Sequence, residues 1–135
     1  MQKDTQEQAL AQAQARAVGG EIACADAHEI AEALGLSPRE IGVLINRSSE
    51  LRFFRCQLGV FGYGLKTEGE SKIVHAAQRV PPDIDEAIDK VAKNGRVSCA
   101  DLWDIADRVK YPRLQLGNIA EAKGLKITPC QLGCF

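Results

Sequence analysis

The second half of the chain shows apolar residues at helical spacing. Between Asp83 and Lys93 they recur at positions i, i+3, i+4, i+7 and i+8, which places them on one face of a helix. Asn94–Gly95 ends that helix, because glycine readily takes the left-handed conformation found at helix C-termini. Asp101 is placed to cap the next helix, and Pro112 suits the first turn of a third. The pattern therefore predicts a helix over 83–93, a strand over 96–99, helices over 101–110 and 112–123, and a strand over 125–128.

The first half gives the same order of elements. Apolar periodicity and turn residues predict helices over 4–18, 26–34 and 37–47, and strands over 21–24 and 51–56. Beyond the last strand, Gly59 and the run Gly62–Gly64 suit a tight strand pair or wing. Both halves are thus predicted to fold as helix, strand, helix, helix, strand.

Two motifs recur at an offset of 74 or 75 residues. The hexapeptide CQLGVF begins at Cys56 and CQLGCF begins at Cys130, while Cys24–Asp26 returns as Cys99–Asp101. An ordered set of matches indicates a duplicated unit of roughly 65 residues. Pro81–Pro82 cannot continue a helix and marks the boundary, although the stretch before it can hold a helical turn. We therefore expect one unit over 1–66, a linker over 67–82, and a second unit with a truncated wing over 83–135.

Residues 27–46 resemble the helix-turn-helix of winged helix-turn-helix DNA-binding proteins. Ala31 is the small residue where the two helices cross, and Gly35 provides the left-handed turn. The apolar positions that seat the second helix on the first are Ile30, Leu34, Leu36, Ile41 and Leu44. In the second half Lys110 replaces the turn glycine, so that copy departs from the pattern. The resemblance implies a mainly α fold with small β-wings (α+β), two tandem winged helix-turn-helix units, and sequence-specific binding of double-stranded DNA in transcription control.

The net charge of −1 conceals a segregation of charge along the chain. Residues 1–35 carry −4, residues 36–66 carry +3, residues 67–107 carry −4 and residues 108–126 carry +4. Each basic block falls where a winged helix meets DNA, and there cations displace the counterions of the phosphates. The expected DNA-binding residues are Ser37, Arg39, Val43, Asn46, Arg47, Arg52 and Arg55 in the first unit, with Arg113, Gln115, Asn118, Lys123 and Lys126 as their counterparts. For any one of them, an ordinary solvated helix face is the alternative.

The five cysteines allow two interpretations. Four form two repeated pairs, Cys24 with Cys99 and Cys56 with Cys130, and the simpler interpretation is that each is a small buried apolar residue. The alternative is a thiolate site for a metal or for redox sensing, although the chain contains no CxxC motif. Cys134 has no repeated counterpart, and we expect it to be the exposed, oxidisable thiol.

Several classes of protein are excluded on sequence grounds. The chain has no GxSxG, P-loop or HExxH motif, so neither an enzyme nor a cofactor is predicted. It has no apolar run that could cross a membrane and no signal-peptide layout, so a cytoplasmic location is expected. The alternative function is a non-enzymatic interaction module that holds a protein partner on the same scaffold. The second unit can also serve for homodimerisation or for packing on the first, which leaves one unit to read a DNA half-site.

Overall fold

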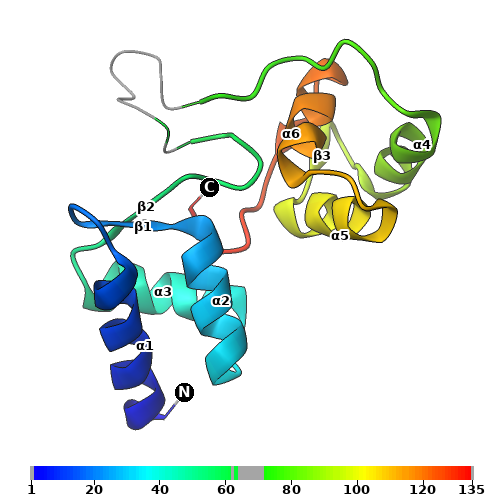
Figure 1. Ribbon diagram of the computed structural model, residues 1–135. Coiled ribbons are helices and arrows are strands. Elements are labelled where there is room, and N and C mark those ends of the chain that lie inside the picture. The colour runs from blue at the N-terminus through cyan, green and yellow to red at the C-terminus, as the bar shows by residue number, and fades with distance from the viewer. Residues whose placement is uncertain (1, 62, 64–71, 135) are drawn as a thin grey trace. The chain divides into compact units, whose positions relative to one another are not determined.

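The computed structural model describes residues 2–61, 63 and 72–134 (Figure 1). Within these residues the fold is mainly helical, with two small parallel sheets of two strands each. The chain divides into two compact units, which are described separately below. Among the described residues, none of the helices combines the length and the apolar run that a membrane span requires.

Unit 1 comprises the chain up to Cys56 together with Gln131–Cys134. Its elements are α1 (Lys3–Arg16), β1 (Glu21–Ala23), α2 (Cys24–Leu34), α3 (Pro38–Ser48) and β2 (Arg52–Phe54). Strand β1 pairs in parallel with β2, so that Ile22 lies beside Phe53. The three helices bury their small and branched apolar side chains against one another, and the core side chains include Ala9, Ala13, Ile22, Ala27, Ile30, Ile41 and Ile45.

Unit 2 comprises Gln57–Cys130. Its elements are α4 (Pro82–Val91), β3 (Arg96–Val97), α5 (Cys99–Val109), α6 (Arg113–Ala122) and β4 (Lys126–Ile127). Strands β3 and β4 pair in parallel, with Val97 beside Ile127. Its core holds Ile84, Ile88, Leu102, Ile105, Leu116 and Ile119.

The two repeats fold alike, as the sequence predicted. Each has the order helix, strand, helix, helix, strand, and in each the two strands are parallel partners. Two predicted caps are wrong. Helix α4 ends at Val91 with Ala92 extended, so Asn94–Gly95 form the turn between the bridged residues Lys93 and Arg96 and do not cap the helix. Helix α5 begins at Cys99 rather than at Asp101, and the hydroxyl of Ser98 accepts the backbone N–H of Asp101 at 3.0 Å. A serine one position before the helix satisfies a free N–H of the first turn, so Asp101 lies inside that turn instead of capping it.

The expected wing and linker differ from what the described residues show. From Arg55 to Phe61 no strand follows β2, and Gly62 and Gly64 of the expected wing lie outside the described residues. The sequence allows a helical turn within the linker, and residues 72–80 have no regular secondary structure. This stretch is held by backbone bonds instead: the N–H groups of Ile73 and Val74 both donate to the carbonyl of Gly59, at 2.9 and 3.1 Å.

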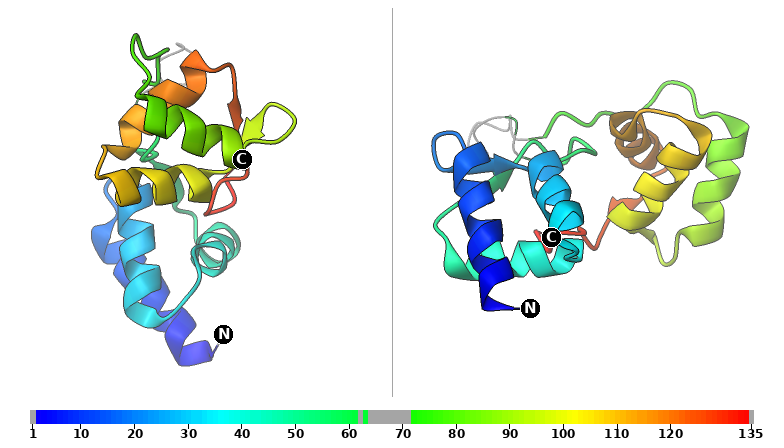
Figure 2. Two further views of the ribbon diagram at one scale, coloured as in Figure 1. Left: turned by 90° about the vertical axis from the view of Figure 1, so that its right-hand side faces the viewer. Right: turned by 60° about the horizontal axis from the view of Figure 1, so that its bottom comes forward.

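The compact units do not coincide with the repeats. The Gln-Leu-Gly part of the first CQLG segment lies in unit 2 and that of the second lies in unit 1, while Cys56 stays in unit 1 and Cys130 in unit 2. In unit 1 the backbone of Leu132 lies against Gly42 of α3, and in unit 2 the backbone of Leu58 lies against Gly117 of α6. In the right-hand view of Figure 2, the red end of the chain accordingly lies beside the cyan helices of unit 1. Each unit is completed by a segment that follows the other repeat.

The turns between the paired helices have the same backbone conformation with different residues. Gly35 follows α2 with φ of 69°, and Lys110 follows α5 with φ of 56°. After each turn an N–H returns to the preceding helix, from Leu36 to Ala31 at 2.8 Å and from Tyr111 to Ala106 at 2.9 Å. A left-handed backbone is costly for a side chain with a Cβ, so the second turn carries strain that the first does not.

Replacing Lys110 by glycine is expected to stabilise the chain. The substitution removes the Cβ penalty of the left-handed conformation and should raise the free energy of unfolding by about 1 kcal/mol. Urea denaturation followed by circular dichroism measures the change. The mirror variant, Gly35→Lys, is the control and should lower the free energy by about the same amount. A destabilising effect of Lys110→Gly would mean that the lysine side chain outweighs the backbone strain.

Candidate nucleic-acid interface

Helix α3 begins with a capping box. The hydroxyl of Ser37 accepts the N–H of Glu40 at 3.0 Å, and the Glu40 carboxylate accepts the N–H of Ser37 at 3.1 Å. This reciprocal pair satisfies two N–H groups of the first turn and fixes where the helix starts. The bond from the Ser37 backbone holds the pKa of Glu40 below its usual value. Ser37 is exposed, but its hydroxyl is already engaged in the cap.

One side of α3 faces the core and the other faces solvent. Ile41, Leu44 and Ile45 are buried, and this packing leaves the positions between them on the outside. The outer face carries Arg39, Val43, Asn46 and Arg47, all of which are exposed. Val43 is 41% exposed, which is a large fraction for a branched apolar side chain. The four residues that the sequence placed on this helix are thus brought together on one surface.

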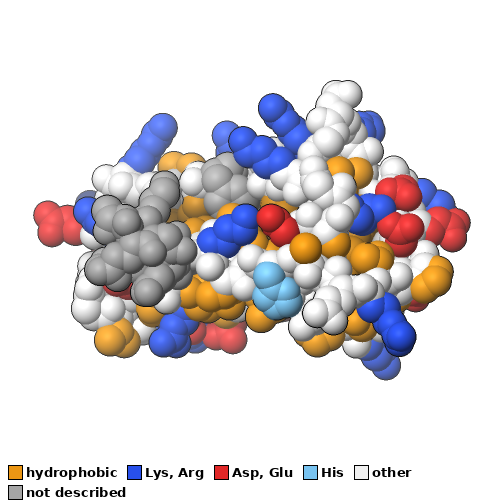
Figure 3. Space-filling view, turned by 90° about the horizontal axis from the view of Figure 1, so that it is seen from above, with side chains coloured by type: hydrophobic (Ala, Val, Ile, Leu, Met, Phe, Trp, Pro, Cys, Tyr) orange, Lys and Arg blue, Asp and Glu red, His pale blue; other side chains and the backbone are white. Residues whose placement is uncertain are grey.

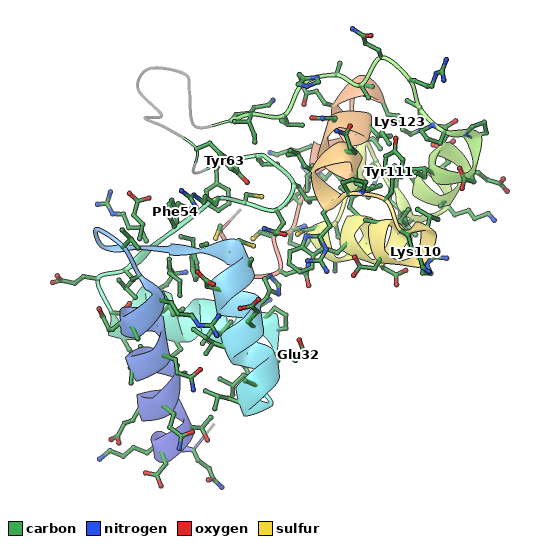
Figure 4. The ribbon with its side chains drawn as sticks, in the orientation of Figure 1. Glu32, Phe54, Tyr63, Lys110, Tyr111 and Lys123 are labelled. Atoms are coloured by element: carbon green, nitrogen blue, oxygen red, sulfur yellow. The ribbon has the colours of Figure 1, made fainter. Side chains whose placement is uncertain are left out.

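Strand β2 and the residue after it add two further cations. Arg52 is exposed, and its N–H donates to the carbonyl of Gly20 at 3.0 Å. Arg55 follows the strand with φ of 51°, and its guanidinium lies 5.0 Å from the ring centre of Phe54, which is labelled in Figure 4. A cation over an aromatic face is held in place without losing its charge. The ring of Phe54 therefore restricts the orientation of the Arg55 side chain.

Four arginines of unit 1 are not neutralised within the described structure, whereas Arg16 pairs with Asp26 and Glu29. Arg39, Arg47, Arg52 and Arg55 form no ion pair with any carboxylate in residues 2–61, 63 and 72–134. In the space-filling view of Figure 3, which takes in both units, Lys and Arg side chains project at several places and hydrophobic side chains are exposed beside them. We define the basic face of unit 1 as Arg39, Val43, Asn46, Arg47, Arg52 and Arg55.

Arg113 of unit 2 is engaged within its own unit. Its guanidinium donates two hydrogen bonds to the Asp107 carboxylate, at 2.9 and 3.2 Å, and lies 3.8 Å from the ring centre of Trp103. A paired and stacked guanidinium has little capacity left for a phosphate or a guanine edge. Arg113 therefore stabilises the junction of α5 with α6.

Lys123 is likewise paired within unit 2. Its ammonium contacts Asp85 and Asp89 of α4, with 2.8 Å to the Asp89 carboxylate, and its side chain is only 17% exposed (Figure 4). The hydrogen bonds to Asp85 and then Asp89 raise the pKa of Lys123 above its usual value. With two carboxylates around one ammonium, this cluster is net acidic and does not attract a phosphate.

Asn118 is buried, contrary to the sequence prediction of an exposed reader. It is 3% exposed, and its side-chain oxygen accepts the N–H of His75 at 3.0 Å. The N–H of Ala77 donates to its backbone carbonyl, also at 3.0 Å. The segment before α4 thus runs along this face of α6. Of the five residues expected in the second unit, Gln115 and Lys126 remain exposed.

The repeat offset explains why α6 lacks the arginines of α3. At 75 residues from Arg39 and Arg47 stand Leu114 and Ala122, so the equivalent positions of α6 carry no cation. Lys126 and Asn118 stand at the positions of Arg52 and Val43, whereas Arg113, Gln115 and Lys123 match none of the first unit's expected residues by position. Comparing the two copies position by position would have revealed the difference. Unit 1 is the copy that retains an exposed basic helix.

The positions of the four repeated cysteines agree with the simpler interpretation, in which each is a small buried apolar residue. Cys24, Cys56, Cys99 and Cys130 are buried and Cys134 is exposed, and all five are thiols. Cys24 and Cys99 open α2 and α5. Nowhere in the described part of the chain do three His, Cys, Asp or Glu side chains gather as a metal site requires. The repeated cysteines belong to the hydrophobic core.

Comparisons with protein-family models, with curated proteins and with solved structures gave no match.

Proposed function

We propose that unit 1 binds double-stranded DNA in the manner of a winged helix-turn-helix protein, with α3 as the recognition helix. The observation that carries this proposal is the basic face of unit 1, which combines exposed arginines with an exposed asparagine on one helix and the following strand. Helix α2, the left-handed turn at Gly35 and the capped start of α3 form the helix pair that such a proposal requires. The activity is that of a transcriptional regulator.

The residues of the basic face have separate roles in this proposal. Arg47 and Asn46 lie on α3 and have the side chains that make paired hydrogen bonds to guanine and adenine edges in the major groove. Arg52 and Arg55 lie on or beside β2 and neutralise phosphates of the backbone. Val43 contacts an apolar base edge, such as the methyl group of thymine.

Unit 2 contributes no equivalent reader. Arg113 and Lys123 are paired with carboxylates, and Asn118 is buried beneath the segment that includes His75 and Ala77. We therefore propose that one chain contacts a single half-site through unit 1. This agrees with the alternative that only one of the two repeats reads DNA.

Removing two arginines of α3 tests the proposal. In fluorescence polarisation with labelled duplex DNA, Arg39→Ala/Arg47→Ala is expected to weaken binding about 10- to 100-fold at roughly 50 mM salt. The slope of log Kd against log salt should fall by about 1 for each of the two arginines that contacts a phosphate rather than a base edge. Circular dichroism checks that the variant keeps its helices.

The matched control is Lys90→Ala/Arg108→Ala. It removes the same charge from two exposed positions of unit 2, each paired with a carboxylate four residues away. Binding should change less than about threefold. If the wild-type chain does not bind duplex DNA at low salt, or if both double variants lose affinity equally, the basic face of unit 1 is not a DNA-binding surface.

A further inference from the structure

The two glycines inside helices α3 and α6 form the floors of two equivalent grooves. Gly42 and Gly117 stand 75 residues apart, and both are buried. A Cβ built on Gly42 would overlap the carbonyl of Leu132, and one built on Gly117 would overlap the carbonyl of Leu58. Only glycine lets a second backbone approach a helix this closely. Each groove is therefore shaped for a backbone and not merely for a side chain.

The segments in the two grooves carry the same three residues, Gln-Leu-Gly, and each follows a cysteine that stays in the donor unit. Leu58 is fully buried and Leu132 is 1% exposed, while Cys56 and Cys130 just before each segment are also buried. Because the two grooves and the two segments are alike, the chain contains the same docking site twice. The site recognises a Gln-Leu-Gly turn through a buried leucine and a backbone seated on glycine.

Neither repeat keeps its own segment. Leu58 follows β2 of unit 1 and seats in unit 2, and Leu132 follows β4 of unit 2 and seats in unit 1. Exchange of identical elements between equivalent folded units is the hallmark of domain swapping, in which the same contacts form whether the donor is the same chain or another. The groove therefore accepts the segment equally well from its own chain and from a second copy of the chain.

We propose that the Gly42 groove is an exchangeable docking site, and that two copies of this chain associate by donating Gln131–Cys134 to each other. The partner is a second copy of the chain. The dimer repeats the contacts of the single chain, so its stability relative to the monomer depends on chain concentration. This proposal does not depend on DNA binding.

Two complementary defective variants test the exchange. The first lacks residues 131–135, so it has an open Gly42 groove and no donor segment. The second is Gly42→Val, which keeps the donor and blocks the groove. Neither alone can form the reciprocal dimer. Mixed at about 100 μM, they are expected to form a 1:1 complex of twice the 14.6 kDa chain mass, measured by native mass spectrometry and light scattering.

A peptide measurement makes the test independent of how well Gly42→Val folds. A fluorescent peptide of residues 127–134 is added to the chain that lacks 131–135, and anisotropy reports binding. Saturable binding, or recovery of helix content where the truncated chain has lost it, supports the proposal. The control peptide carries Leu132→Asp and should bind at least tenfold more weakly, because the leucine is buried in the groove. A mixture that stays monomeric, or a peptide that neither binds nor restores structure, overturns the proposal.

Discussion

Alanine at position 117 is expected to destabilise unit 2 strongly, although alanine is the better helix former. Helix propensity alone would make Gly117→Ala stabilising by about 1 kcal/mol. The added Cβ would instead overlap the carbonyl carbon and oxygen of Leu58, and neither the helix nor the seated backbone can move without loss of packing. We expect the free energy of unfolding to fall by roughly 2–3 kcal/mol.

Urea denaturation with circular dichroism and tryptophan fluorescence measures this effect, since the single tryptophan, Trp103, lies on α5 of unit 2. Gly42→Ala is the matched variant in unit 1 and should show a loss of similar size in the circular dichroism signal. The sign of the change in unfolding free energy shows whether helix propensity or the overlap with Leu58 dominates. A stabilised Gly117→Ala variant would show that helix propensity dominates and that Leu58 does not rest on the helix backbone.

Truncation of Leu58 is expected to have a large effect for a side chain that lies outside the helices and strands. Leu58 is fully buried in unit 2, and its loss leaves a cavity in addition to the lost transfer free energy. Leu58→Ala should lower the free energy of unfolding by about 2–5 kcal/mol. The result would be unexpected for a residue that follows the last strand of the first repeat, where a surface loop is the usual prediction.

The control for Leu58 is Val43→Ala, which removes apolar atoms from an exposed position of α3 and should change stability by less than about 0.5 kcal/mol. Thermal and urea unfolding of both variants give the comparison. A loss below about 1 kcal/mol for Leu58→Ala would mean that the segment is not part of the core of unit 2.

Local patterns predicted the elements of this fold well. The helices around Ile84, Ile30 and Ile41 follow from apolar spacing, and the turn at Gly35 follows from the need for a left-handed residue. The duplication made each half a check on the other. These features depend on neighbours within one or two helical turns, which sequence reasoning can use directly.

Long-range contacts decided what sequence reasoning missed. The Cys-Gln-Leu-Gly repeat fits equally well on its own unit or on the other, because the two grooves are equivalent, so the pattern contains no information on the exchange. Asn118 was predicted to be exposed because its burial depends on a segment more than forty residues earlier. Arg113 and Lys123 counted as available cations because their carboxylate partners lie on other elements.

The exchanged segments also set when the units can be completed during synthesis. Ninety positions separate Gly42 from Leu132, so the α3 groove leaves the ribosome long before the residues that fill it. At about 5–20 residues per second, the interval is roughly 5–18 seconds, whereas helices form within microseconds. For unit 2 the order is reversed, because Leu58 is made before α6. Both units are thus completed only when the last residues of the described chain are made, and until then the apolar side chains around Gly42 stay exposed on a nascent chain that a chaperone would recognise.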